Sequence, residues 1–288
     1  MAKFLIFPDA EALDRALSDC PSSEVHVEPL EVPSFCTGIA PPALLVTGNV
    51  SAFLSELHGK EVPLAGVIAY SPFKKDFAKA PAPDPRWKDI IGGLRVISVR
   101  PSASDSLKLR IDAVPLKPIG DLIPVMARMI RGGAYQPSRR ILAFEEDQRL
   151  VVLAADVVTV CRAEDLLDTW IMLRTVVEFI CTAWEGRLTV EPDLRPRWGL
   201  GVNEIFRRLP GSNCGVCGEA SCMEFALGIF TGRHRLRECS PLFEEVNRAS
   251  LESLRWVLDM IGLPQDSAQF SVQGYDPSRR SGASPREP

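Results

Sequence analysis

Four of the chain's eight cysteines lie in one glycine-rich segment, residues 209–242. Cys214, Cys217 and Cys222 follow the spacing C-x2-C-x4-C, and Cys239 comes after a further sixteen residues. Three thiolates at such short intervals can bind one face of an inorganic centre, and the fourth thiolate can bind it from further along the chain. The segment therefore predicts a metal centre, and an iron–sulfur cluster accounts best for this spacing.

The residues between the third and fourth cysteines predict a helix that would position both. Ser221 followed by Glu224 is typical of a helix start, and Gly232 stands where a helix would end. The intervening apolar residues would form the buried face of this helix: Phe225, Ala226, Ile229 and Phe230. The first two cysteines then lie in a loop, the third in the first helical turn, and the fourth after the helix.

A [4Fe-4S] cluster would explain why glycines stand next to the cysteines in this segment. Such a cluster with four thiolates is anionic, and its sulfurs favour nearby backbone N–H donors. Gly215 and Gly218 allow positive φ angles and a close approach of the chain. Cys222 at a helix start would add the positive end of the helix dipole, and Asn213 could brace the loop with its side-chain amide.

Two alternatives for these cysteines remain open at the level of sequence. Zinc is usually held by two closely spaced pairs, whereas the last cysteine here stands sixteen residues from the third. Reduced thiols without any metal are the second alternative. Cys20, Cys161 and Cys181 lie outside this segment, at helix ends or on apolar faces, and are expected to behave as small hydrophobic residues. A second cluster built from them together with Cys36 is therefore less expected than a single one.

The run LPGSNCGVCGEASCMEFALGIFTG resembles a small four-cysteine [4Fe-4S] domain. That domain occurs in the large subunit of the corrinoid iron–sulfur protein and in the B subunit of Rnf-type ferredoxin oxidoreductases. The resemblance covers residues 200–245 and implies that Cys214, Cys217, Cys222 and Cys239 are the ligands of one [4Fe-4S] cluster.

This sequence departs from that family in two respects. Proline usually follows the last cysteine directly, whereas Ser240 stands between Cys239 and Pro241 here. The chain also shows neither an Rnf-like membrane helix nor a corrinoid-binding signature. The resemblance therefore implies the type of cluster but not the biological process.

A second resemblance concerns the N-terminal part of the chain. The stretch FLIFPDAEALDRAL, with VHVEPLEVPSFCTGIAPPALL after it, is similar to a family of short proteins assigned as sulfur or selenium carriers. Cys36 would be the matching thiol, although Thr37 separates it from Gly38 where the family has Cys-Gly.

The remaining sequence predicts a mixed fold of the α+β or α/β class. Alternating strands and helices indicate a small α/β unit over residues 1–75, and the order β-β-α-β-β-α indicates a second over 90–186. The cluster domain with a C-terminal amphipathic helix follows over 200–264, and residues 265–288 lack apolar periodicity, as in a disordered tail.

Charge and composition limit the classes of partner and location. The net charge of −4 gives no general case for nucleic-acid binding. The N-terminus lacks the pattern of a secretory signal, and charged residues interrupt every long apolar stretch, so we expect no membrane span. A cytoplasmic location with reduced thiols follows as the expectation.

Two functions from different classes fit these features. The first is a soluble electron-transfer protein that passes electrons to a partner redox or corrinoid enzyme. The second is a redox sensor, or an accessory or carrier protein for metalloenzyme maturation. No convergent set of polar residues indicates catalysis, so an enzyme is less expected. The basic run GRHRLR, residues 232–237, is either a solvated loop or a docking patch for an acidic protein partner.

Overall fold

The structure is a computed structural model, and the chain divides into two compact units. The first contains residues 1–123 and 136–184, and the second contains 124–135 and 185–288. The residues that the structure describes are 2–19, 25–33, 36–71, 84–103, 105–130 and 132–263. The predicted tail at 265–288 and Cys20 lie outside these described residues.

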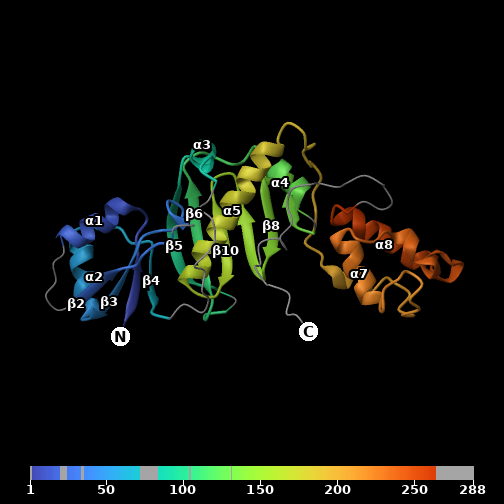
Figure 1. Ribbon diagram of the computed structural model, residues 1–288, viewed down its shortest axis with the longest axis horizontal. Helices are drawn as coiled ribbons and strands as arrows, with labels where there is room; N and C mark the ends of the chain where they lie inside the picture. Colours follow the sequence, from blue (N-terminus) through green and yellow to red (C-terminus); the bar gives the residue numbers. More distant parts are fainter. Residues whose placement is uncertain are drawn as a thin grey trace, which may run out of the picture. The chain divides into compact units, whose positions relative to one another are not determined.

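The first unit begins with a four-stranded sheet in the order β2-β3-β1-β4 (Figure 1). Its strands are β1 (Lys3–Ile6), β2 (Val25–Pro29), β3 (Ala43–Gly48) and β4 (Gly66–Ala69). Both β1 and β2 run antiparallel to β3, which lies between them, and β4 runs antiparallel to β1. Strands and helices alternate along the chain, yet every strand pair in this sheet is antiparallel. The reason is that α1 connects β1 to β2, and β3 lies between these two strands.

Two helices bury their apolar residues with this sheet. They are α1 (Ala10–Asp19) and α2 (Val50–Gly59). Asp9 begins the first helix, since its Oδ1 accepts the N–H of Ala12 at 2.9 Å. The shared core combines residues of both helices with alternating strand residues: Leu5, Phe7, Ala12, Ala16, Leu44, Val46, Phe53, Leu57 and Val62.

A six-stranded sheet follows, in the order β5-β6-β10-β9-β8-β7. Its strands are β5 (Leu94–Pro101), β6 (Leu109–Pro115), β7 (Ala134–Gln136), β8 (Ile141–Glu146), β9 (Arg149–Leu153) and β10 (Val158–Ala163). The sequence predicts paired strands around the turns PSASDS and EDQ, and the structure confirms them as the antiparallel pairs β5–β6 and β8–β9. The predicted order β-β-α-β-β-α contains four strands, and the structure adds β7 and β10 as separate strands.

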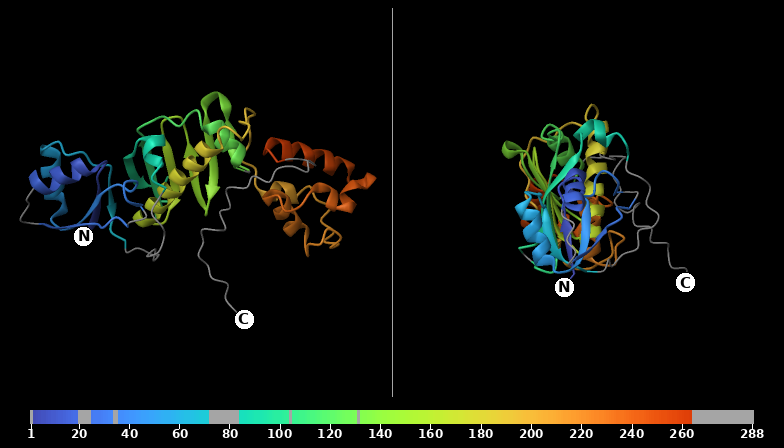
Figure 2. Two further views of the ribbon diagram at one scale, coloured as in Figure 1. Left: turned by 45° about the horizontal axis from the view of Figure 1, so that its top comes forward. Right: turned by 90° about the vertical axis from the view of Figure 1, so that its left-hand side faces the viewer.

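The long helix α5 (Leu166–Gly186) lies across one face of this sheet (Figures 1 and 2). The sequence predicts a helix over 163–184 with a buried apolar stripe from Leu166 to Trp184. The stripe is buried from Leu166 to Ile180, but Trp184 is 40% exposed, so that prediction was wrong at the last turn. The short helices α3 (Trp87–Ile91) and η2 (Pro137–Arg139) precede β5 and β8.

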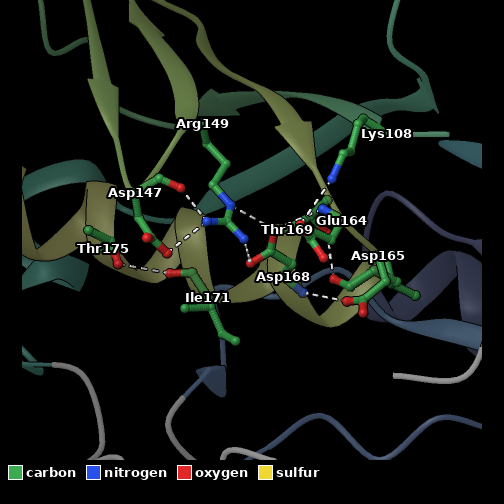
Figure 3. A network of polar contacts seen from close by, with 10 residues as sticks. Lys108, Asp147, Arg149, Glu164, Asp165, Asp168, Thr169, Ile171 and Thr175 are labelled. Atoms are coloured by element: carbon green, nitrogen blue, oxygen red, sulfur yellow. Dashed lines mark hydrogen bonds and ion pairs between the residues drawn. The ribbon is translucent and has the colours of Figure 1, made fainter. Parts of the chain in front are cut away.

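A buried ion pair fixes the start of α5, as Figure 3 shows. Arg149 of β9 donates from Nε and Nη2 to the two carboxylate oxygens of Asp168, at 2.9 and 3.0 Å. The Nη1 of Arg149 also reaches Oδ2 of Asp147 at 2.7 Å, and Asp165 accepts the N–H of Asp168 at 2.9 Å. Because breaking such a buried pair costs about 3–5 kcal/mol, this network anchors the helix to the hairpin.

The two sheets of the first unit meet at their edge strands. The N–H of Val99 on β5 donates to the carbonyl of Ala65 at 2.8 Å. A Cβ at Gly66 would lie 2.2 Å from the carbonyl oxygen of Val99. Glycine at this position therefore permits the close approach.

The described part of the second unit is mainly helical, apart from Ala134 and Tyr135 of β7. It contains α4 (Ile123–Met129), which starts one residue before the unit boundary, α6 (Val202–Phe206), α7 (Cys222–Thr231) and α8 (Arg248–Met260). Between α7 and α8 stand three short 3-10 helices: η3 (Leu236–Glu238), η4 (Ser240–Phe243) and η5 (Glu245–Asn247). The sequence predicts one amphipathic helix over 243–263 with Val246 on its apolar face. The helix starts later, at Arg248, because Glu244 is extended, and Val246 is 84% exposed.

Arg197 secures the segment that leads into this helical unit. Its guanidinium donates to the carbonyls of Ile130, at 2.8 Å, and Ala127, at the end of α4. Asp193 lies 3.6 Å away as its ion-pair partner. The composition of residues 185–201 predicts a linker; in the structure a buried arginine, Arg197, holds this segment to the end of α4.

No helix in the described ranges is long and apolar enough to span a bilayer.

Candidate metal centre

The loop before α7 turns at residues with left-handed backbone angles. Gly215 and Gly218 have φ angles of 72° and 88°, which confirms the prediction made from their sequence positions. The N–H of Gly218 donates to the carbonyl of Gly215 at 2.9 Å, closing a tight turn around Val216 and Cys217. The chain therefore reverses between the first two cysteines, as two ligands on one centre require.

Asn213 braces this loop against the helix. Its side-chain oxygen accepts the backbone N–H of Cys222 at 2.8 Å, nine residues further along the chain. Asn213 itself has a φ of 47°, a conformation that asparagine tolerates better than most residues. The bond confirms the predicted bracing role and fixes the first cysteine segment to the third cysteine.

The predicted caps place Cys222 at the first residue of α7. The Oγ of Ser221 accepts the N–H of Glu224 at 3.2 Å, and Gly232 ends the helix with a φ of 80°. Because helix N-termini carry partial positive charge, a thiolate on Cys222 would be stabilised there.

The sequence suggests an extended arm before Cys239, with Arg233, Arg235 and Arg237 aligned along it, and the structure differs from this expectation. Arg235 is extended, but Leu236 is buried and begins η3. Arg233 and Arg237 are exposed, whereas Arg235 is half-buried. The three arginines therefore do not align along one strand, because burial of Leu236 turns the chain before Cys239.

The structure places Cys214, Cys217 and Cys222 near enough to Cys239 for their charges to affect it. Cys222 is 7% and Cys239 is 5% exposed, while Cys217 is half-buried and Cys214 is exposed. Burial raises the pKa of the Cys239 thiol, and charges on the other three cysteines raise it further. The N–H of Leu242 acts in the opposite direction as a hydrogen-bond donor.

Cys214, by contrast, favours the thiolate. The N–H of Val216 is the largest cause that lowers the pKa of Cys214, and the side chain of Ser212 adds to it. Glu244 opposes this through its negative charge, which shows that the segment after Cys239 lies near the first cysteine. Thiolates are the metal-binding form of cysteine, so the lowered pKa of Cys214 favours the form that binds iron.

The donors around these sulfurs fit an iron–sulfur cluster. The backbone N–H groups of Val216 and Leu242 lower the pKa of Cys214 and Cys239, and the Leu242 N–H also donates to the carbonyl of Cys239 at 3.1 Å; two left-handed glycines shape the loop. Such donors stabilise the negative charge of a thiolate-bound cluster. Among the described residues, no three His, Cys, Asp or Glu side chains are arranged to hold a single metal ion.

The other described cysteines lie in different surroundings. Cys36 is fully buried, and burial raises its pKa to about 12, against a smaller opposing effect of Arg174. Cys181 is buried in α5, and Cys161 is half-buried on β10. Cys36 is therefore a protonated interior thiol in this structure, unlike the reactive thiol that a carrier would present.

One polar cluster beside the cysteines was not predicted from the sequence. His234 lies between the carboxylates of Glu219 and Glu238, at 2.7 and 2.5 Å. The spacing of four residues between His234 and Glu238 was the available signal. Glu219 could not be anticipated, because the fold brings it to His234 from fifteen residues away.

Comparison with known proteins confirms the resemblance noted for this segment. Residues 209–241 match a family described as "Putative Fe-S cluster". The gamma subunit of the acetyl-CoA decarbonylase/synthase complex of Methanosarcina acetivorans is 43% identical over 42 residues, 15% of this chain and 9% of that protein. The corrinoid/iron-sulfur protein large subunit of Moorella thermoacetica is 36% identical over 50 residues, 17% of this chain and 11% of that protein.

A further relative is an uncharacterised protein of Methanocaldococcus jannaschii, 32% identical over 79 residues, 27% of this chain and 35% of that protein. The chain thus spans about a third of that relative and about a tenth of the two subunits. No solved structure matches the chain. The matches support an iron–sulfur protein whose similarity to known proteins centres on the cysteine segment.

Proposed function

We propose that this chain is a [4Fe-4S] protein that transfers electrons to a protein partner. Its single cluster is held by Cys214, Cys217, Cys222 and Cys239. The observation that carries this proposal is the local fold of these residues: a tight turn at Gly215–Gly218 presents the first two cysteines, the bond from Asn213 ties their loop to Cys222 at the start of α7, and Cys239 is buried after the helix. The iron–sulfur family match over the same residues supports it.

The chain's own residues tune the site for one-electron exchange. A bound [4Fe-4S] cluster supplies a single redox equivalent whose potential depends on hydrogen bonds to sulfur and on exposure. The N–H groups of Val216 and Leu242 stabilise negative charge on Cys214 and Cys239. The buried Cys222 and Cys239 exclude water on one side, and the exposed Cys214 opens the other side to a partner.

The partner in this proposal is a redox or corrinoid enzyme with an acidic docking surface. Two relatives are named as subunits, one of a decarbonylase/synthase complex and one of a corrinoid/iron-sulfur protein. Arg233 and Arg237 are exposed just before Cys239 and offer positive charge to such a surface. A cytoplasmic location belongs to the same proposal, since thiols kept free for a cluster suit a reducing compartment.

A sensor or accessory role is the second candidate, and the exposure of Cys214 favours it. An accessible ligand is open to oxidants, so oxygen would release the cluster and change the affinity for a partner. In either role the chain acts through its cluster and a protein partner rather than as an enzyme with its own substrate.

An anaerobic redox titration separates the two candidates. An electron carrier gives a reversible one-electron couple by electron paramagnetic resonance, and its cluster content survives repeated cycles. Irreversible loss of the cluster on the first oxidation, with a changed affinity for the partner, would favour the sensor. Absence of any reducible iron–sulfur signal would contradict both.

A further inference from the structure

A histidine joins two acidic residues next to the cysteine segments. The Nδ1 of His234 lies 2.5 Å from Oε2 of Glu238, and its Nε2 lies 2.7 Å from Oε1 of Glu219. The side chains of His234 and Glu219 are 18% and 19% exposed. The side chain of Glu238 is 38% exposed, so the contact with Glu219 is the better shielded from solvent of the two.

The two carboxylates belong to the two segments that carry the cysteines. Glu219 stands between Cys217 and Cys222, and Glu238 directly precedes Cys239. One imidazole thus connects the C-x2-C-x4-C loop with the turn that presents the fourth thiol.

The helix between these segments is shaped to receive the ring. The backbone N–H of His234 donates to the carbonyl of Gly228 at 3.0 Å, and the ring lies 5.2 Å from the ring of Phe225. A Cβ on residue 228 would lie 2.2 Å from Cδ2 of His234. Glycine at this helical position therefore makes room for the histidine.

The charges around the ring favour the imidazolium form. Each nitrogen faces a carboxylate oxygen, so each must donate a proton for both bonds to exist. Glu238 is the largest cause that raises the pKa of His234, with Glu219 also contributing against the effect of burial. Arg233 lies 3.5 Å from Glu219 and offsets part of the negative charge. Hydrogen bonds between charged partners are shorter and stronger than neutral ones.

We propose that His234 is the positioning residue of this metal centre. By bridging Glu219 and Glu238, it holds the loop of the first three cysteines against the turn of Cys239 before a cluster arrives. This inference rests on the proposed function, since it assigns to His234 the task of arranging the ligands of that cluster. His234 acts through the two carboxylates rather than as a ligand itself.

Two substitutions test the bridge in different ways. His234→Gln removes the positive charge and cannot hold both carboxylates. Gly228→Ala keeps every polar group but displaces the ring, because the new Cβ would overlap it. Alanine is favoured over glycine inside a helix, so a weaker helix would not explain a loss in that variant. His58→Gln in the first unit is the matched control, since His58 lies in α2.

The first measurement uses the full chain with its cluster installed anaerobically. Loss of visible absorbance after addition of an iron chelator gives the release rate. We expect both variants to release iron about tenfold faster than wild type or the His58 control, as for other residues that orient metal ligands. We also expect a changed paramagnetic resonance signal of the reduced cluster, with unchanged far-ultraviolet circular dichroism. Release at the wild-type rate in both variants would overturn the proposal.

The second measurement uses the metal-free full chain and reports on the bridge alone. Amide hydrogen exchange of residues 214–222 and 236–239 should be faster in both variants than in wild type. If wild type never forms an iron–sulfur cluster, the proposed function fails while this exchange still shows whether the bridge orders the two segments. If wild type forms the cluster but exchange and release are unchanged in the variants, the bridge fails and the proposed function stands.

Discussion

The side-chain oxygen of Asn213 accepts the backbone N–H of Cys222 at 2.8 Å. This bond connects the residue before the first cysteine with the first residue of α7. It also satisfies one of the N–H groups that a helix leaves unpaired at its start. The loop and the helix therefore form one unit, and changes at Asn213 should affect cysteines on both.

Two substitutions of Asn213 distinguish the effect of the hydrogen bond on stability from the effect of the left-handed backbone angle. Asn213→Gly keeps the left-handed φ accessible but removes the acceptor, whereas Asn213→Asp keeps an acceptor oxygen. We expect the glycine variant to lower the free energy of unfolding of the metal-free second unit by about 1 kcal/mol. The aspartate variant should stay within about 0.5 kcal/mol of wild type. Urea unfolding measures both, and equal losses would show that the bond is not the cause.

A substitution at Gly218 tests whether the loop requires a left-handed backbone angle there, because an added side chain would meet no steric conflict. A Cβ there would meet no atom within 4 Å, but φ is 88°. Gly218→Ala should therefore destabilise the metal-free loop by about 1 kcal/mol or more through backbone strain alone. Gly59→Ala is the matched control, because a Cβ there is also unobstructed and no positive φ applies.

The two glycine variants are compared by urea unfolding and by cluster content after anaerobic reconstitution. Gly59→Ala should hold the full cluster and be as stable as wild type or slightly more stable, since it lies at the end of helix α2. Equal behaviour of both variants would mean that the loop adapts to alanine and that the positive φ of Gly218 is not required.

The local features of the metal centre could be predicted from sequence because they depend on neighbouring residues. Ser221 and Glu224 define the start of α7, and Gly232 defines its end, in the sequence as in the structure. Positive φ angles could likewise be predicted at Gly215 and Gly218, because glycine has no side chain to oppose them. The number and spacing of the cysteines indicated the class of centre.

Features that depend on distant contacts could not be predicted in the same way. The strand β3 separates β1 from β2, which no local pattern reveals. The apolar residue Val246 fitted a helical stripe, but the extended Glu244 places it outside α8. The bridge through His234 required Glu219 from fifteen residues away, so only the folded chain shows it.

Cys36 should behave as an interior thiol rather than as a carrier. Burial raises its pKa to about 12, so nearly all of it is protonated at pH 8. We expect iodoacetamide to leave Cys36 unmodified in the folded protein and to modify it fully in denaturant. In the folded protein, any reaction should quicken with each rise in pH up to about 12, because the thiolate fraction grows. Mass spectrometry of the peptide gives the extent, and rapid labelling at pH 8 would restore the carrier hypothesis.

The basic residues before Cys239 should steer negatively charged partners to the cluster. Arg237 is the better test, because Arg233 also pairs with Glu219 at 3.5 Å. Arg237→Glu should slow oxidation of the reduced protein by the anionic iron(III)–EDTA complex and leave or raise the rate with cationic hexaamminecobalt(III). The difference should shrink with salt, since exposed charges are screened beyond about 10 Å at 0.1 M.

Arg207→Glu is the control for this charge reversal, since Arg207 is exposed in the same unit. Stopped-flow absorbance at two salt concentrations provides the rates. If Arg237→Glu and Arg207→Glu change the two reactions equally, the loop has no special steering role and reduces to a solvated segment.

Iron and sulfide content of single-cysteine variants decides whether these four thiols hold one cluster. Anaerobic wild-type protein and the controls Cys36→Ala and Cys181→Ala should carry about four irons and four acid-labile sulfides per chain, with the Mössbauer spectrum of one cubane. Alanine at Cys214, Cys217, Cys222 or Cys239 should abolish this content. In the Cys217→Ala variant, circular dichroism should still show the strands and α5 of the first unit. Stoichiometric zinc without sulfide in wild type, or full cluster content in any of the four variants, would contradict a [4Fe-4S] centre on these four cysteines.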